Sequence, residues 1–346
     1  MMRISGHQLG ATVQTQDSQG RQPVQLYTTR YGPIDKQAIR AQLAQLAGSG
    51  GVTARDERIL EYLRELHVLS AEQLRRLFWT TGSLKTVRNR MSKMVTPALV
   101  RRARVPDTEM ARWGLTGRVV YALGIGGWMW LKEEVDPKIM DRALRREQVL
   151  HDLLVAEICV RMLEAAAIRG QDWSISWAGE ESASFCQQEG GSKRNGHSGE
   201  TQVVIAPDGL AVVTQQQGDT KGELPMFIEL DKGREAHSMP HTDWGRKVVG
   251  YNRFYESDWR MHPQLADLPE FPAVAVVTHG ARRLLNLVDS IVSHRKHVAY
   301  YLALWSDLMA VNDILSAPAW LMITPDGEVV GREREQRQRL LPPVDG

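Results

Sequence analysis

Hydrophobic residues between positions 55 and 95 recur at the spacing of amphipathic helices. In the segment "RDERILEYLRELHVL", Ile59, Leu60, Leu63 and Leu66 fall on one helical face. Ser70 is a good N-cap for a second helix over "SAEQLRRLFW", and "SLKTVRNRMSKMV" forms a third helix after a short break. Two strand-like segments follow, "ALVRRARV" and "TGRVVYALG". Three helices and then a two-stranded ribbon predict a winged helix-turn-helix domain over residues 52–131.

The pattern changes after residue 149, where strands and helices alternate. A long amphipathic helix, "VLHDLLVAEICVRMLEAAAIRG", precedes the strand-like segments "WSISWAG", "TQVVIAPDG", "LAVVTQQ" and "MFIELD". The segment "DWGRKVVGYNRFYESD" is typical of a helix, and "FPAVAVVTHG" is apolar enough to be a buried central strand. A helix over residues 282–297 and the segment "APAWLMITPDG" follow. The alternation predicts an α/β domain over residues 149–325, and thus a mixed α+β and α/β fold class for the chain.

The remaining segments have the composition of arms and linkers. Residues 1–51 are predicted to be an N-terminal arm and linker that ends at "AGSGG", and residues 132–148 a polar connecting helix. We expect the loop at 187–201 to be mobile, and the charged tail at 326–346 to be disordered. The glycine-rich "GIGGWMWL" has no Lys-Ser/Thr ending, which favours a turn and a helix start over a phosphate cradle.

Composition narrows the class of protein. Hydrophobic residues make up 42% and charged residues 24% of the 346 positions, which is typical of globular proteins. No apolar run of about 18 residues is present, so no membrane span is predicted. The first residues lack the apolar core of a secretory signal. Cys159 and Cys186 lack CxxC spacing, which argues against a zinc finger and fits a reducing, cytoplasmic location.

The third predicted helix and the ribbon carry charge of one sign. Seven Lys and Arg residues and no Asp or Glu lie between Ser83 and Arg104. With the apolar positions of the helix turned inward, the outward set is Lys85, Thr86, Arg88, Asn89, Ser92 and Lys93. Arg and Asn suit base edges, while Lys and Ser can hold phosphates. The predicted contacts to double-stranded DNA are Lys85, Arg88, Asn89, Arg90, Lys93, Arg101, Arg102 and Arg104.

Two other interpretations of this charge stay open. A charge run is commonly a solvated helix face, and a winged helix can also serve as a protein-binding module in an assembly adaptor. The coincidence of the basic run with the position of a recognition helix favours DNA binding.

Acidic residues gather at the end of two predicted strands in the second domain. Asp208 follows the apolar run "VVI", and Glu229 and Asp231 lie in "MFIELD". Residues two apart on a strand project to the same face, so Glu229 and Asp231 point together. With Asp208 they predict an oxygen-ligand site for Mg²⁺ or Mn²⁺, which could support phosphodiester cleavage. The alternative is that these carboxylates cap turns or pair with nearby Lys and Arg, since "PDG" is a common turn sequence.

The order of strand, "PD", strand and acidic pair resembles the PD-(D/E)xK nuclease superfamily. The resemblance implies catalytic roles for Asp208, as the Asp of "PD", and for Glu229, as the (D/E) position. Asp231 stands where the superfamily has Lys, and Lys247 in "RKVVGY" could return the missing ammonium group. Glu157 and His151 on the long helix could add a fourth group. The set implied for a divalent-metal endonuclease or nickase is therefore Asp208, Glu229, Asp231 and Lys247.

Most of the chain resembles the replication-relaxation family of plasmids and other mobile elements. The resemblance covers roughly residues 55–325 and rests on the winged-helix segment, "HDLLVAEI", "PDG", "FIELDKGRE" and "KVVGY". It implies a cytoplasmic DNA-binding protein that acts in plasmid replication or mobilisation through a winged helix coupled to a nuclease-like domain. The partners expected for the chain are double-stranded DNA, replication or transfer proteins and a second copy of the chain, and no membrane is expected.

Overall fold

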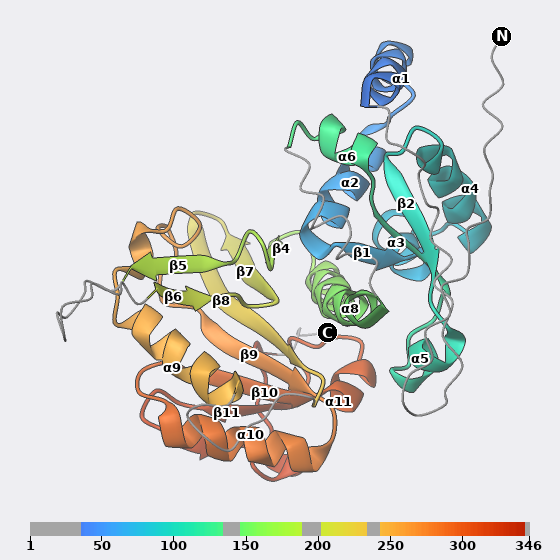
Figure 1. The fold of residues 1–346 in the computed structure, drawn as a ribbon. Helices are drawn as coiled ribbons and strands as arrows, with labels where there is room; N and C mark the ends of the chain where they lie inside the picture. Colours follow the sequence, from blue (N-terminus) through green and yellow to red (C-terminus); the bar gives the residue numbers. More distant parts are fainter. Residues whose placement is uncertain (1–35, 134–145, 189–201, 234–242, 343–346) are drawn as a thin grey trace, which may run out of the picture. The chain divides into compact units, whose positions relative to one another are not determined.

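The computed structural model describes residues 36–133, 146–188, 202–233 and 243–342 (Figure 1). The chain divides into two compact units, residues 1–156 and 157–346. The division falls inside the long helix α8 (Arg146–Arg169), which matches the long amphipathic helix predicted from the sequence. The arm before residue 36, most of the connecting segment and most of the loop predicted to be mobile lie outside the described residues.

The first unit combines helices with a small antiparallel sheet. Its helices are α1 (Lys36–Ser49), α2 (Ala54–Leu66), α3 (Ala71–Phe78), α4 (Leu84–Val95), α5 (Asp107–Arg112) and α6 (Ile125–Trp130). Its strands are β1 (Val68–Ser70), β2 (Val100–Arg104) and β3 (Val119–Leu123), in the order β1-β3-β2. The predicted succession of three helices and a two-stranded ribbon is present as α2, α3, α4 and the β2–β3 pair (Figure 1).

N-cap residues in the sequence mark where α2, α3 and α4 begin. Thr53 and Ser70 each form a capping box, with Asp56 and Gln73 respectively, and Ser83 accepts a hydrogen bond from the Thr86 backbone. Such caps satisfy backbone N–H groups that have no partner inside the helix. The predicted inward face of the first of the three helices is confirmed, because its four apolar residues are buried: Ile59, Leu60, Leu63 and Leu66.

The connection within the ribbon differs from a simple hairpin. Residues 105–118 separate β2 from β3 and include α5. Pro106 precedes the first residue of α5, and the turn beyond the helix contains Gly114 in a left-handed conformation with φ of 66°. Both strands were predicted from the sequence, whereas this short helix was not.

The second unit is built on a seven-stranded mixed sheet in the order β12-β11-β10-β9-β8-β7-β4. Its strands are β4 (Trp173–Gly179), β7 (Gly209–Gln217), β8 (Thr220–Asp231), β9 (Ala273–Thr278), β10 (Tyr300–Leu304), β11 (Trp320–Ile323) and β12 (Val329–Val330). A separate pair is formed by β5 (Phe185–Gln188) and β6 (Gln202–Ile205), and the helices are α9 (Asp243–Tyr255), α10 (Ala281–His294) and α11 (Trp305–Met309). β8, β9 and β10 are parallel, and the other neighbours in the large sheet are antiparallel.

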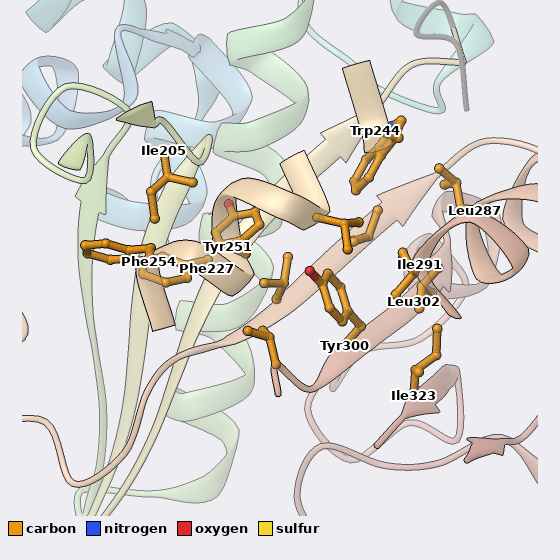
Figure 2. Packing of buried hydrophobic residues seen from close by; sticks show 14 of the residues in the cluster. Ile205, Phe227, Trp244, Tyr251, Phe254, Leu287, Ile291, Tyr300, Leu302 and Ile323 are labelled. Carbon is orange, nitrogen blue, oxygen red and sulfur yellow. The ribbon is translucent and has the colours of Figure 1, made fainter. Parts of the chain in front are cut away.

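Helices α9 and α10 pack against one face of this sheet. Tyr251 and Phe254 of α9 and Leu287 of α10 belong to the same buried cluster as Phe227 of β8 and Leu302 of β10 (Figure 2). β9 is almost wholly buried, as predicted for a central strand. Helices and sheets together confirm the predicted α+β class.

The end of the chain differs from the disordered tail that was predicted. Residues 326–342 are described, and β12 pairs with β11 at the edge of the sheet. The backbones of Trp320 and Gln338 exchange two hydrogen bonds of 3.1 and 2.6 Å, and Leu341 donates to the Leu315 carbonyl. Backbone pairing of this kind depends little on side-chain polarity, which explains why the charged composition was misleading.

Candidate functional site

The predicted outward face of α4 is exposed in the structure. All six of its residues are exposed, namely Lys85, Thr86, Arg88, Asn89, Ser92 and Lys93. Val87, Met91 and Met94 are buried on the other side of the helix. The helix therefore presents three basic side chains and one Asn to solvent from a single surface.

Arg90 differs from the other residues predicted to contact DNA. It donates from Nε to Oδ1 of the buried Asp56 at 2.8 Å, from Nη2 to Oδ2, and from Nη2 to the Gly51 carbonyl at 2.9 Å. Burial raises the pKa of Asp56, but hydrogen bonds from Arg90 and Thr53 outweigh it and hold the pKa below its usual value. Arg90 thus fastens α4 to α2, and it is not part of the outward face.

The three arginines of β2 fall on two sides of the ribbon. Arg102 and Arg104 are exposed, with the buried Ala103 between them, while Arg101 is half-buried. Arg102 is paired with Tyr121 and Arg104 with Val119 in the register of β2 and β3. Only Arg102 and Arg104 therefore extend the basic surface of α4 in the way that was predicted for the wing.

Arginines from α4 and the ribbon surround one hollow of about 410 Å³. Its lining residues are Arg88, Arg102, Arg104, Arg118, Val119 and Tyr121. Burial raises the pKa of Tyr121, and the charges of Arg102 and Arg88 act in the opposite direction, which shows that both arginines lie near the phenol. Arg118 also forms an ion pair with Asp107.

Arg118 is not among the predicted DNA contacts because it lies outside the basic run that ends at residue 104. The pairing of β2 with β3 is the feature that reveals Arg118. Arg104 pairs with Val119, so the residue before Val119 lies beside the last arginine of β2.

In the second unit, the buried Glu229 is held by two side chains of α9. Glu229 is 1% exposed, and its Oε2 accepts a hydrogen bond from Lys247 Nζ at 2.6 Å. Its Oε1 accepts one from the Tyr251 hydroxyl at 2.7 Å. Burial raises the pKa of Glu229 to about 7 against the opposing effect of Lys247, and the nearby charge of Asp208 raises it further. Lys247 and Tyr251 are four residues apart and so share one face of the helix.

Asp208 lies beside this pair, directly before β7. Its Oδ2 accepts a hydrogen bond of 2.6 Å from the backbone N–H of Leu230. Gly209 pairs with Ile228, which places the start of β7 against the last residues of β8. The structure therefore brings Asp208, Glu229 and Lys247 together, whereas their catalytic roles stay a prediction.

Asp231 has different partners from Glu229, although both lie on one side of β8. Arg283 donates to its two oxygens from Nε at 2.7 Å and from Nη2 at 2.8 Å. Thr278 donates at 2.6 Å and the Gly233 backbone at 3.2 Å. Burial raises the pKa of Asp231, but the hydrogen bonds from Arg283 and Thr278 outweigh it and lower the pKa below its usual value. Both oxygens of Asp231 accept hydrogen bonds, as both oxygens of Glu229 do, and the metal-ligand role of Asp231 stays a prediction.

The divalent-metal site stays a prediction. Within the residues that the structure describes, no group of three or more His, Cys, Asp and Glu side chains is arranged to hold a metal ion. Glu157, a predicted fourth group, accepts a hydrogen bond from Arg161 one turn later on α8 at 3.1 Å. Asp208 and Glu229 are two of the predicted carboxylates, and the charge of Asp208 acts on Glu229.

A model of the replication-relaxation family matches residues 60–265, which is more than half of the 346 positions. The chain belongs to this family. The match confirms the resemblance that the sequence motifs implied. No curated protein and no solved structure matches this replication-relaxation protein. Across the described ranges, none of its helices is both long and apolar enough to cross a membrane.

Proposed function

We propose that this replication-relaxation protein binds double-stranded DNA through α4 and the β2–β3 ribbon, and that it acts in the replication or mobilisation of a plasmid or other mobile element. The family description supports the biological setting. The order of α2, α3, α4 and the ribbon supports a winged helix-turn-helix, in which α4 is the recognition helix and the ribbon is the wing.

One observation carries the proposal. The exposed face of α4 and the exposed arginines of β2 meet around a single hollow with four guanidinium groups. Arg88 belongs to the helix and Arg102 to the ribbon, so the basic surface spans both elements of the proposed DNA-binding module. A solvated helix face would not require the charges of a neighbouring ribbon to gather at the same place.

The test is the affinity of Arg88→Ala for a duplex that the wild-type protein selects from a random library. We expect this substitution to weaken binding by about 1–3 kcal/mol, because it removes a group suited to base edges. Lys85→Ala should weaken binding more evenly across sequences and lower the slope of log K against log salt by about one. Fluorescence anisotropy with a labelled duplex at several salt concentrations measures both quantities.

Arg40→Ala is the matched control, since Arg40 is an exposed arginine of α1, which does not line the hollow. It removes the same charge from the same unit and should leave the affinity nearly unchanged. Equal losses in Arg40→Ala and Arg88→Ala would show that only net charge matters. Binding without salt dependence, or no duplex binding at all, would favour the protein-binding adaptor.

A second candidate function is divalent-metal-dependent cleavage of DNA by the second unit. It is favoured by the close grouping of Asp208, Glu229 and Lys247, the geometry expected if Lys247 supplies the ammonium group missing at position 231. Asp208 and Glu229 would hold Mg²⁺ or Mn²⁺, which, when bound, would stabilise negative charge on the phosphate. Lys247 would favour the ionised form of Glu229 against the effect of burial and could hold a phosphate oxygen. Asp231 would act through Arg283 to hold the edge of the sheet in place.

Nicking of a supercoiled plasmid in the presence of Mg²⁺ or Mn²⁺ tests this second function. Wild-type protein should nick the plasmid, and Asp208→Asn and Glu229→Gln should abolish nicking. Asp219→Asn should retain it, because Asp219 is an exposed residue in the turn between β7 and β8. Absence of nicking by the wild type with either metal would leave DNA binding as the sole proposed function.

A further inference from the structure

The strand at one end of the large sheet has an edge that no other strand of the described ranges covers. β4 is the last strand in the order β12-β11-β10-β9-β8-β7-β4, and it pairs with β7 over seven residues. The strand at the opposite end, β12, has only two residues. Natural sheets limit edge-to-edge association with short edge strands, charged side chains or Pro. β4, with the sequence "WSISWAG", has none of these features.

The hydrogen bonds between β4 and β7 show which backbone groups of β4 point to this open edge. The Gln216 N–H donates to the Asp172 carbonyl at 2.8 Å, so these two residues form a hydrogen-bonded pair directly before β4. Hydrogen-bonded and non-hydrogen-bonded pairs alternate along an antiparallel ladder. The N–H and C=O groups of Ile175 and Trp177 therefore point away from β7. Within the described part of the chain, no residue forms a hydrogen bond with these outward groups.

The first five residues of β4, "WSISW", have the same order in both directions around Ile175. Trp173, Ile175 and Trp177 project to one side of the strand, and Ser174 and Ser176 project to the other. The three apolar side chains are half-buried, and the two serines are exposed. An antiparallel copy centred on Ile175 would place Trp173 opposite Trp177 of that copy, and Ser174 opposite its Ser176. The strand is thus complementary to itself.

We propose that two copies of the chain pair through β4 in antiparallel orientation, around a two-fold axis at Ile175. The two Ile175 residues would exchange two backbone hydrogen bonds, and each Trp177 N–H would donate to the Trp173 carbonyl of the other copy. The Trp173 N–H takes no part, because it donates to the Gly170 carbonyl of its own chain at 3.2 Å.

Charge and sequence both favour a second copy as the occupant of this edge. β4 contains no charged side chain, so its self-pairing opposes no like charges. A strand with another sequence would lack the match of Trp to Trp and of Ser to Ser. The pairing lies in the second unit, and it does not depend on the DNA binding proposed for the first.

Sedimentation equilibrium of the full chain measures this association. A pair of five-residue strands is smaller than the interface of a tight dimer, so we expect a reversible dimer with a dissociation constant of about 10–100 µM. Two double variants test the register. Ser174→Lys with Ser176→Lys opposes like charges at both serine pairs and should weaken association by about tenfold. Ser174→Lys with Ser176→Glu opposes unlike charges and should associate at least as tightly as the wild type.

Gln264→Lys with Ser293→Lys is the control for net charge, because both residues are exposed and lie outside β4 in the same unit. This variant should associate as the wild type does, and urea unfolding confirms that each variant is folded. Equal association of the two-lysine β4 variant and the wild type would overturn the proposal. Equal losses in the Lys–Lys and Lys–Glu variants would overturn it as well. A wild-type chain that stays monomeric up to about 200 µM would exclude self-pairing and leave the edge to a strand of another protein.

Discussion

Two buried carboxylates on one side of β8 have pKa values shifted in opposite directions. Glu229 and Asp231 are both 1% exposed, yet the pKa of Glu229 is raised and that of Asp231 is lowered. Asp231 has the paired donors of Arg283 and a hydroxyl donor, which together outweigh the cost of burial. Glu229 has one ammonium donor and one hydroxyl donor, Lys247 and Tyr251, and the added repulsion of Asp208, so its donors do not outweigh burial. The difference therefore lies in the partners and not in the depth of burial.

The raised pKa of Glu229 makes the stability of the fold depend on pH in a defined direction. The pKa rises from 4.5 to about 7 on folding, so the folded state binds more protons between these values. Stability from this group is thus full below pH 4.5 and is lost as the pH rises through about 7. Glu229→Gln removes the titration, and its free energy of unfolding relative to wild type should increase from pH 5 to pH 8 by at most about 3 kcal/mol.

Urea unfolding of both proteins at the two pH values measures this change. Glu328→Gln serves as the control, because Glu328 is an exposed glutamate of the same unit. Its free energy of unfolding relative to wild type should stay nearly constant with pH. If Glu229→Gln behaved in the same way as Glu328→Gln, the raised pKa would be wrong.

At the residue scale, the ion-pair partner of a carboxylate is easier to predict from the sequence when it lies nearby along the chain than when it lies far away. Lys247 was expected near the acidic residues because it could return the ammonium group missing at position 231, and its Nζ donates to Glu229. Arg283, the partner of Asp231, lies 52 positions later on a different helix, and no motif links the two. Only the folded sheet, in which β8 and β9 run in parallel, brings them together.

At the scale of elements, α6 lies unusually close to the segment that precedes β2. A Cβ atom added at Gly126 would lie 2.5 Å from the Pro97 carbonyl oxygen, and one at Gly127 would lie 2.4 Å from that of Leu99. The N–H of Gly126 donates to the Ala98 carbonyl at 2.9 Å. The glycines of "GIGG" thus permit a close approach of two backbones, which accords with a turn and helix start in that segment.

Gly126→Ala should therefore destabilise the protein, by about 1–3 kcal/mol, because the backbone atoms that it meets cannot move aside as a flexible side chain could. Gly48→Ala is the matched control. Gly48 lies in α1, and nothing lies within 4 Å of an added Cβ there. That substitution should leave stability unchanged or raise it by up to about 1 kcal/mol, as expected for Ala in a helix. Thermal unfolding of both variants compares them, and an equal effect in both would contradict the close approach.

The elements with a strong period were predicted well, and the shortest elements were not. The apolar and polar faces of α4 and the burial of β9 follow from the sequence. The short helix α5 and the edge strand β12 have too few residues to show a period. Their formation depends on neighbours that a local pattern does not reveal.

At the scale of the whole molecule, summed properties conceal the features that matter for function. The formal net charge is only +2, yet four arginines gather around one hollow. The family match spans residues 60–265, whereas Thr278 and Arg283, which hold Asp231, lie beyond its end. The hydrogen-bond partners of Asp231, at the end of β8, thus come from a part of the chain outside the matched range.

The contacts of α9 with β8 fix more than a pair of charges. Trp244, Lys247 and Tyr251 lie along one side of the helix and reach Asp231 and Glu229 in turn. A helix that packs only through apolar side chains can slide or rotate and recover its buried area with other residues. One residue inserted between Trp244 and Tyr251 would turn the later part of the helix by about 100° and leave Glu229 without its donors. Polar contacts thus fix the register of α9 against β8. Insertions in the loops that flank this helix should therefore be tolerated better in evolution than insertions within it.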